Sequence, residues 1–469
     1  MKIEQIYTGC LAEAAYYIES DGEIAIIDPL RDFEPYLQMA DKANGKIKYI
    51  FETHFHADFV SGHLSLAEKT GADIIFGPTA NTSFPSIKAK DNQVFNLGLI
   101  KIKVLHTPGH TQESVSYLLI DEAGKETALF TGDTLFIGDV GRPDLAVKSN
   151  LSQEDLAGML FDSLRNKIMT LPDDIIIYPG HGAGSSCGKN MSKETYSTLR
   201  LQKELNYALR ADMSKQEFVQ EVTNGLEEPP QYFPKNVELN KLGYESIESI
   251  LKNGVIGLSV SEFSEIKSEL NALIIDTRDP QVFKNGFIPG SINIGINGSF
   301  APWIGSLIKN IKQPILFVAE EGYEKEVVTR LSRVGYDNTL GYLEGGINSW
   351  SLDNRKIETI QSISAQELAN KIREDIYVLD VRKKGEYESE HIDALNLEHF
   401  PLDTLYQNIN DLDKNSQYYI HCASGYRSMI FSSILKSNGF NNIIEVAGGF
   451  KAISKTSIPT TAFICPSTL

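Results

Sequence analysis

Short apolar runs separated by polar turns fill the first 180 residues of the chain. Their β-branched residues predict strands rather than helices. Several runs end in Thr, His or Asp, and side chains at strand ends and in the loops that follow converge on one edge of a sheet. We therefore expect a functional site at such an edge. The predicted strands are 23–29, 47–54, 72–77, 99–106, 114–120, 127–133 and 174–181.

Helical spacing appears between and after these strands. Residues 64–71 predict a helix that ends at Gly71, and residues 190–215 carry good helix formers after a Ser/Thr start. The segment 225–243 contains three prolines, so we predict a linker or arm there.

The second half of the chain contains an internal repeat. Residues 273–294 match 377–397, and residues 315–347 match 418–450, with an offset of about 103 residues. Each copy reads as a strand, a D-x-R turn, a helix, a strand, a loop, a helix, a strand and Gly-Gly. This alternation predicts two small parallel α/β domains.

Composition narrows the class of protein. A chain of 469 residues is long enough for two to four domains. The net charge of −18 disfavours nucleic acid or an anionic membrane surface as the main partner. Four dispersed cysteines suit a reducing compartment, and neither a secretory signal nor a membrane span is evident, so we expect a cytoplasmic protein.

Metal-ligating residue types gather at the predicted strand ends. The stretch THFHADFVSGH, residues 53–63, contains His54, His56 and Asp58, and His110, Asp133 and His181 follow later strands. A folded sheet can bring such residues to one ion. A two-metal hydrolase is expected to read H-x-H-x-D-H here, but this chain has Phe59 in place of the last His.

The order of these motifs resembles the metallo-β-lactamase superfamily over about residues 1–240, which implies an αββα sandwich. Within it, GDTLFIGDVGRPDL, residues 132–145, is similar to the signature of the persulfide dioxygenases. That resemblance implies one Fe(2+) per chain, held by His54, His110 and Asp133. Two His and one carboxylate leave open positions on iron, as O2 chemistry requires.

Other residues of this region are expected to support the metal site. Phe59 cannot coordinate a second ion, so we interpret His56, Asp58 and His181 as partners that orient ligands or bound water. Arg142 either binds a carboxylate or phosphate of the thiol carrier or forms a surface salt bridge. Cys187 holds a persulfide or is a plain small residue, and Tyr178 lines the pocket.

The second copy of the repeat carries a candidate nucleophile. Cys422 begins the loop CASGYRS between a strand and a helix, where backbone N–H groups, the helix dipole and Arg427 stabilise a thiolate. This resembles a rhodanese sulfurtransferase domain over about residues 360–455, and four residues between Cys and Arg favour sulfur over phosphoryl transfer. In the first copy, Ala319 and Glu324 replace Cys422 and Arg427, which predicts an inactive domain.

Together these features predict three α/β domains: a metallo-β-lactamase-like sandwich with a helical arm (1–240), an inactive rhodanese-like domain (250–355) and an active one (358–469). The resemblance implies a persulfide dioxygenase–sulfurtransferase that acts on a low-molecular-weight thiol persulfide, O2 and sulfite to form thiosulfate. We expect a homo-oligomer, a dimer or a tetramer. The alternatives are a zinc thioesterase of the glyoxalase II type and a non-catalytic sulfur carrier or scaffold.

Overall fold

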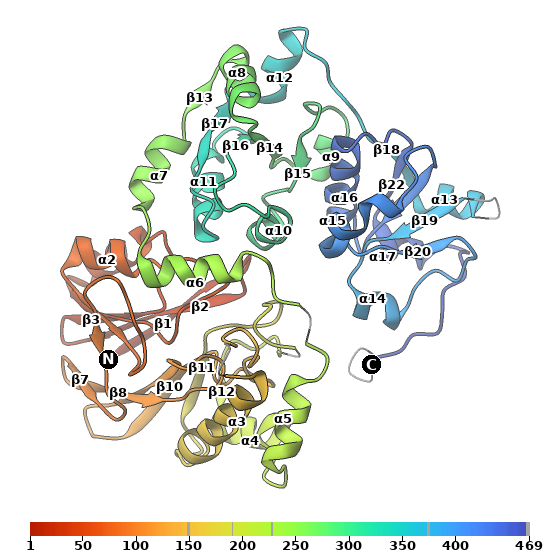
Figure 1. Ribbon diagram of the computed structural model, residues 1–469. Helices are drawn as coiled ribbons and strands as arrows, with labels where there is room; N and C mark the ends of the chain where they lie inside the picture. Colours follow the sequence, from red (N-terminus) through yellow and green to blue (C-terminus); the bar gives the residue numbers. More distant parts are fainter. Residues whose placement is uncertain (148–150, 190, 227, 373–375, 466–469) are drawn as a thin grey trace. The chain divides into compact units, whose positions relative to one another are not determined.

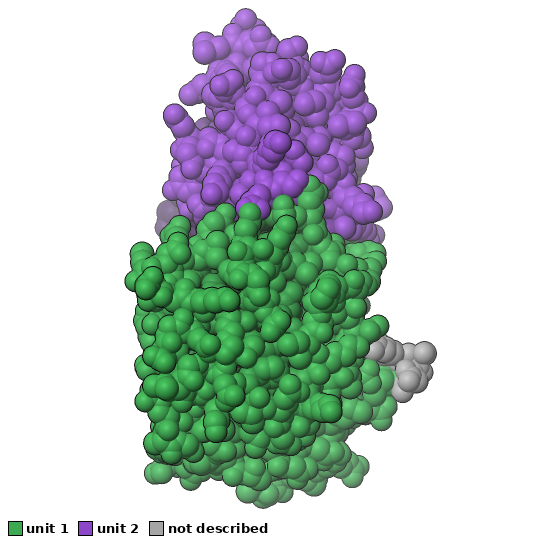
Figure 2. Space-filling model, turned by 90° about the vertical axis from the view of Figure 1, so that its left-hand side faces the viewer, with its two compact units in different colours: residues 1–247, 332–335 green, residues 248–331, 336–469 purple. Residues whose placement is uncertain are grey.

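The computed structural model describes residues 1–147, 151–189, 191–226, 228–372 and 376–465. It divides into two compact units: residues 1–247 with 332–335, and residues 248–331 with 336–469 (Figures 1 and 2). Asn190, Glu227 and residues 466–469, which belong to predicted segments, lie outside the described residues. No helix in the described part of the chain is long and apolar enough to cross a membrane.

Unit 1 contains two six-stranded mixed sheets whose strands follow one another in chain order. The first sheet is β1 (Lys2–Thr8), β2 (Glu13–Ser20), β3 (Glu23–Ile27), β4 (Lys46–Phe51), β5 (Asp73–Phe76) and β6 (Ile87–Lys88). The second is β7 (Val94–Leu97), β8 (Ile100–His106), β9 (Val115–Ile120), β10 (Glu126–Gly132), β11 (Ile176–Pro179) and β12 (Ser197–Thr198).

The two sheets pack face to face through alternating apolar side chains of both, for example the rings of Phe51 and Tyr117, whose centroids lie 4.7 Å apart. Helices cover the outer faces: α2 packs on β4 and β5, and α3 and α5 share a second apolar cluster with strands of the second sheet (Figure 1). This confirms the predicted αββα sandwich. The helices are α1 (Glu34–Ala43), α2 (His63–Thr70), α3 (Gln153–Ser163), α4 (Leu199–Leu205), α5 (Lys215–Thr223) and α6 (Phe233–Leu242), with a π-helical turn at Leu164–Ile168.

Two local predictions were wrong. The predicted helix over 190–215 is interrupted: α4 ends at Leu205 and a short 3-10 turn follows at Tyr207–Leu209. Asn206 between them is extended, and its side-chain amide donates hydrogen bonds to the carbonyls of Phe136 and Asp139. The proline-rich segment contains a helix, α6, since Pro234 lies in its first turn, where no N–H is needed. The helix belongs to unit 1.

Unit 2 contains two five-stranded sheets, in both of which every strand pair is parallel. This confirms the predicted pair of parallel α/β domains. The first sheet has the order β13 (Gly257–Leu258), β17 (Thr339–Leu343), β16 (Ile315–Val318), β14 (Leu273–Asp276) and β15 (Ile292–Asn293). The second has the order β18 (Gln361–Ser364), β22 (Ile443–Ala447), β21 (Tyr418–His421), β19 (Tyr377–Asp380) and β20 (Leu397–His399).

The helices of the two copies follow the same order. They are α7 (Ile247–Gly254), α8 (Val260–Leu270), α9 (Pro280–Phe283), α10 (Phe300–Leu307), α11 (Glu324–Arg333) and α12 (Gly346–Leu352), then α13 (Ala365–Lys371), α14 (Lys384–Ser389), α15 (Leu405–Asn408), α16 (Tyr426–Ser437) and α17 (Gly449–Ile453). Both copies keep the D-x-R ion pair, Asp276 with Arg278 at 2.6 Å and Asp380 with Arg382 at 2.5 Å. Because the copy without a cysteine keeps this pair, its role is structural.

Candidate metal centre and sulfur-transfer loop

The structure brings the three predicted metal ligands together. His54 follows β4, His110 lies between β8 and β9, and Asp133 follows β10. One ligand atom of each lies within 4.8 Å of the others. Asp133 Oδ2 lies 3.9 Å from His54 Nε2 and 3.6 Å from His110 Nε2, and all three residues are buried.

In each of these residues, the polar atom that does not face the other two makes a contact that orients the side chain. His54 Nδ1 lies 3.0 Å from the Thr53 hydroxyl, His110 Nδ1 donates to the Arg142 carbonyl at 2.8 Å, and Asp133 Oδ1 accepts from His181 Nδ1 at 2.8 Å. Among the residues that the structure describes, Asp133 Oδ2 has no hydrogen-bond partner, which is costly for a buried carboxylate oxygen unless a cation binds it. Burial and the neighbouring His56 keep the pKa of His54 well below its usual value, so its imidazole is neutral, as a ligand must be. The three residues therefore fit one metal ion.

His56, the second histidine of the H-x-H motif, turns away from this group. Its Nε2 lies 3.1 Å from Asp28 and 3.4 Å from Glu52. Burial alone lowers the pKa of His56, but the two carboxylates outweigh it and raise the pKa well above the usual value. Asp28 also accepts a 2.8 Å hydrogen bond from the Thr53 hydroxyl, which touches His54. His56 thus connects to the candidate ligand through Asp28 and Thr53.

His181 lies between two carboxylates. Its two ring nitrogens donate to Asp133 and Asp58, each at 2.8 Å. Burial alone lowers the pKa of His181, but Asp133 and Asp58 raise it well above its usual value. His181 therefore orients Asp133 as a charged donor. The buried Cys187 thiol lies within 4.8 Å of ligand atoms of Asp58 and His181, and burial and these carboxylates raise its pKa well above the usual value.

Phe59 is fully buried, and its ring lies against that of His56 with centroids 4.3 Å apart. It packs beside the histidine that faces Asp28, so it helps to hold His56 in that orientation. At the position where the two-metal motif H-x-H-x-D-H has its last metal-binding His, this chain therefore has a phenyl ring that contacts His56.

Asn240 of helix α6 makes hydrogen bonds to the loop that carries His56 and Phe59. The Asn240 amide donates to the carbonyls of His56 and Phe59, both at 2.8 Å, and its oxygen accepts from the Ser61 amide at 2.9 Å. Sequence reasoning missed Asn240 because its partners lie some 180 residues away. It also missed Asp28, although Asp28 ends a predicted strand as the candidate ligands do.

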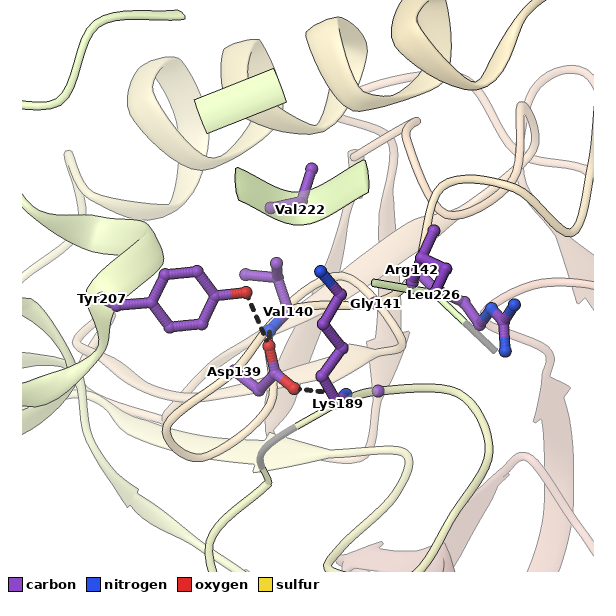
Figure 3. A pocket seen from close by; sticks show the side chains of 9 residues that line it. Asp139, Val140, Gly141, Arg142, Lys189, Tyr207, Val222 and Leu226 are labelled. Carbon is purple, nitrogen blue, oxygen red and sulfur yellow. Dashed lines mark hydrogen bonds between the residues drawn. The ribbon is translucent and has the colours of Figure 1, made fainter. Parts of the chain in front are cut away.

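Two of the predicted substrate-binding residues are engaged inside the protein. The Arg142 guanidinium makes a two-point ion pair with Asp144 at 2.7 Å. This is a salt bridge as in the alternative, but Arg142 is buried rather than at the surface. It borders a small pocket whose Asp139 already bonds Tyr207 and the Lys189 amide (Figure 3).

Tyr178 does not belong to the metal group either. Its ring stacks on Phe130, with centroids 5.3 Å apart, and packs against the core between the sheets. The prediction that Tyr178 lines the site therefore has no support in these contacts, because alternation along β11 points its side chain toward the apolar layer.

Cys422 directly follows β21, in the loop before α16. Its sulfur accepts the Gly425 N–H at 3.1 Å, and Gly425 has φ 114°, a conformation that favours glycine. This agrees with the predicted loop at a helix N-terminus. Arg427 instead makes a two-point ion pair with Glu386, at 2.5 and 2.8 Å, so part of its charge is already balanced. In the first copy, Ala319 follows β16 and Glu324 begins α11.

Comparisons with known proteins agree with this architecture. The family model of the metallo-β-lactamase superfamily matches residues 8–181, and that of the rhodanese-like domain matches residues 259–353 and 364–456. The probable hydroxyacylglutathione hydrolase glo2 of Schizosaccharomyces pombe is 31% identical over 186 residues, which are 39% of this chain and 68% of that protein. The chain belongs to the metallo-β-lactamase superfamily, with rhodanese-like domains after the sandwich.

Two solved structures are also similar to this chain. A metallo-β-lactamase from Staphylococcus aureus subsp. aureus COL is 33% identical, with a TM-score of 0.64, over 73% of this chain and 98% of that chain. ETHE1 from Myxococcus xanthus is 27% identical, with a TM-score of 0.44, over 51% of this chain and 98% of that chain. The matches to the first curated relatives span 47% to 68% of their length. The superfamily fold binds metal ions through His and Asp clusters like the one described above.

Proposed function

We propose that the protein oxidises the persulfide of a low-molecular-weight thiol at a single Fe(2+) and converts the sulfite to thiosulfate at Cys422. The observation that carries this proposal is the group of His54, His110 and Asp133, in a chain that also contains a cysteine loop suited to sulfur transfer. Two histidines and one carboxylate suit non-haem iron, and Phe59 removes one ligand of a second metal.

Iron bound by these residues would supply open positions for O2 and for the persulfide sulfur. Thr53 and the Arg142 carbonyl fix the ring orientations of His54 and His110. His181 holds the carboxylate of Asp133 with a charged hydrogen bond. The overall reaction is RSSH + O2 + H2O → RSH + sulfite + 2 H⁺, so the outer sulfur is oxidised and O2 is reduced.

The second half of the proposed reaction belongs to Cys422. Its thiolate attacks the outer sulfur of a persulfide, which forms Cys–S–SH and releases the thiolate RS⁻. Sulfite then attacks the same outer sulfur, which forms thiosulfate and restores the Cys422 thiolate. The Gly425 N–H supports the negative sulfur at 3.1 Å. The proposed partners are therefore the persulfide, O2 and sulfite.

The test uses the full chain loaded anaerobically with Fe(2+) and supplied with persulfides of glutathione and of coenzyme A. We expect O2 uptake with formation of sulfite and thiosulfate. His110→Ala should abolish O2 uptake, whereas Cys422→Ser should keep O2 uptake and sulfite but lose thiosulfate. Normal thiosulfate formation by Cys422→Ser would contradict the transfer half, and absence of O2 uptake with both carriers would contradict the oxidation half.

A zinc thioesterase of the glyoxalase II type is the second candidate. The curated relatives carry the name hydroxyacylglutathione hydrolase, and Asp58, His181 and Cys187 form a second group of ligand atoms beside the first. Metal analysis with S-lactoylglutathione as substrate separates the two candidates. Two zinc ions per chain with hydrolysis of this thioester would favour the thioesterase, and one iron without hydrolysis would favour the dioxygenase.

A further inference from the structure

A carboxylic acid is buried beneath the Cys422 loop. Glu445 lies in the middle of β22, a central strand of the second rhodanese-like sheet, and its side chain is fully buried. The Gly425 position of the loop is so close that a Cβ atom there would lie 3.5 Å from Glu445 Oε1. Within the described residues, Glu445 makes no ion pair. A carboxyl group in such a place needs an explanation, because a buried and unpaired charge is costly.

Hydroxyl groups connect this carboxyl to the candidate nucleophile. Glu445 Oε2 accepts a hydrogen bond from the Ser362 hydroxyl at 2.6 Å. On the other side, Ser428 Oγ lies 3.4 Å from Glu445 Oε1 and 3.6 Å from Cys422 Sγ. Cys422, Ser428 and Glu445 are all buried. The Ser428 hydroxyl also donates to the Gly425 carbonyl at 3.1 Å, and its rotation toward Glu445 completes a path for a proton from the thiol to the carboxyl without bulk water.

The inactive copy of the repeat serves as an internal comparison. Glu445 pairs with Ser362 in the sheet, and at the matching place of the first copy Tyr342 pairs with Gly257. Alignment on the Gly-Tyr pair places Lys325 where the second copy has Ser428. The copy that lacks the cysteine therefore also lacks the carboxyl and both hydroxyls. A purely structural role in this fold would not require all of them to change together with the cysteine.

We propose that Glu445 is the base that receives the Cys422 thiol proton through the Ser428 hydroxyl, and this inference rests on the proposed sulfur transfer. The thiol proton passes to Ser428 Oγ while the Ser428 hydroxyl proton passes to Glu445 Oε1. The result is a Cys422 thiolate, an intact Ser428 and a neutral Glu445 acid, with no oxidation or reduction. The thiolate then attacks the outer sulfur of the persulfide, and the proton stays available for the departing thiolate RS⁻.

The surroundings favour this direction of transfer. Burial raises the pKa of Glu445, and the hydroxyls of Ser362 and Ser428 and the charge of Lys284 oppose the rise only in part. A neutral Glu445 removes a buried negative charge at the moment when the sulfur becomes negative. Two arginines near the loop are held in ion pairs, Arg427 with Glu386 and Arg382 with Asp380, while Lys284 donates to the Gln281 side-chain oxygen. Burial also lowers the pKa of His421, so this ring is neutral.

The test is the pH profile of Cys422 alkylation by iodoacetamide in the full chain, followed by mass spectrometry of the Cys422 peptide. We expect Glu445→Gln and Ser428→Ala each to slow alkylation at pH 7 by on the order of 100-fold, the scale of a lost proton acceptor, and to move the midpoint of the profile to higher pH. Tyr342→Phe, at the matching position of the inactive copy, should leave the profile unchanged.

The direction of the shift decides the question. If Glu445 were only a fixed negative charge, Glu445→Gln would move the midpoint to lower pH and speed alkylation. If it were only structural, the midpoint would stay in place. Either result overturns the relay, and Ser428→Ala gives the same decision if Glu445→Gln does not fold. Sulfur transfer is measured separately: a wild-type protein that makes no thiosulfate from persulfide and sulfite would refute the proposed function, while the alkylation profile still decides the relay.

Discussion

Substitution of Asn240 tests which interactions stabilise the loop of residues 56–61, which follows the candidate ligand His54. Its buried amide makes three hydrogen bonds, at 2.8, 2.8 and 2.9 Å, to backbone groups of His56, Phe59 and Ser61. Asn240→Ala leaves all three groups without their partner. Each buried group left unpaired costs about 1–3 kcal/mol, and relaxation of the loop brings the total toward the low end, about 3 kcal/mol. The same loop carries Asp58 and follows His54, so metal retention should fall as well.

The chain supplies a matched control one turn earlier on the same helix. Asn236 is equally buried, but neither polar atom of its amide has a hydrogen-bond partner in the described part of the chain. Asn236→Ala removes a similar volume without breaking a hydrogen bond, so its cost should stay within about 1 kcal/mol.

The assay is hydrogen exchange of the peptide that contains the Ser61 amide, together with metal content after dialysis. A local loss of about 3 kcal/mol corresponds to exchange on the order of 100-fold faster. Asn240→Ala should show this increase and Asn236→Ala should not. Equal exchange in the two variants would refute the argument that these three hydrogen bonds hold the loop.

Three further predictions concern other parts of the chain. Burial alone raises the pKa of Glu386, but the ion pair with Arg427 outweighs burial, so the pKa is lowered in the folded protein. The ion pair therefore stabilises the folded state fully above the unfolded pKa of about 4.5, and this stabilisation is lost as the pH falls through the lower folded pKa. The difference in urea midpoint between wild type and Glu386→Gln should shrink on acidification, and a constant difference would contradict the ion pair. Phe59→Ala should lower the free energy of unfolding by about 3–5 kcal/mol in a denaturant titration, because the ring is fully buried, whereas a loss below about 1 kcal/mol would show that the ring is not packed as described. Ala319→Cys in a Cys422→Ser background should form no thiosulfate, since the first copy lacks the arginine and the buried acid; measurable turnover would show that the cysteine alone suffices.

Much of the fold was predictable because its signals are local. Runs such as 99–106 and 114–120 alternate with polar turns, and the structure has β8 and β9 there. Gly71 ends α2 with φ 70°, as its position after a helical pattern predicts. The prediction that the proline-rich segment 225–243 lacks regular structure was wrong, because Pro234 lies in the first turn of α6, where a proline is compatible with a helix.

The sequence by itself determined the strand pattern, the repeat, the strand-end candidates His54, His110 and Asp133, and the contrast between Cys422 and Ala319. These features depend on residue types at short spacings, which the chain displays directly. Only the tertiary structure decided that His56 faces Asp28, that Arg142 pairs with Asp144 and that Tyr178 lies in the apolar layer.

The tertiary structure also revealed partners that lie far apart in the sequence. Asn240 reaches the loop of residues 56–61 across some 180 residues, and Glu445 meets Cys422 through Ser428 only because β22 lies beside β21 in the sheet. Such contacts are made by side-chain geometry after the sheets have formed. The spacing of residues along the sequence does not predict these long-range contacts.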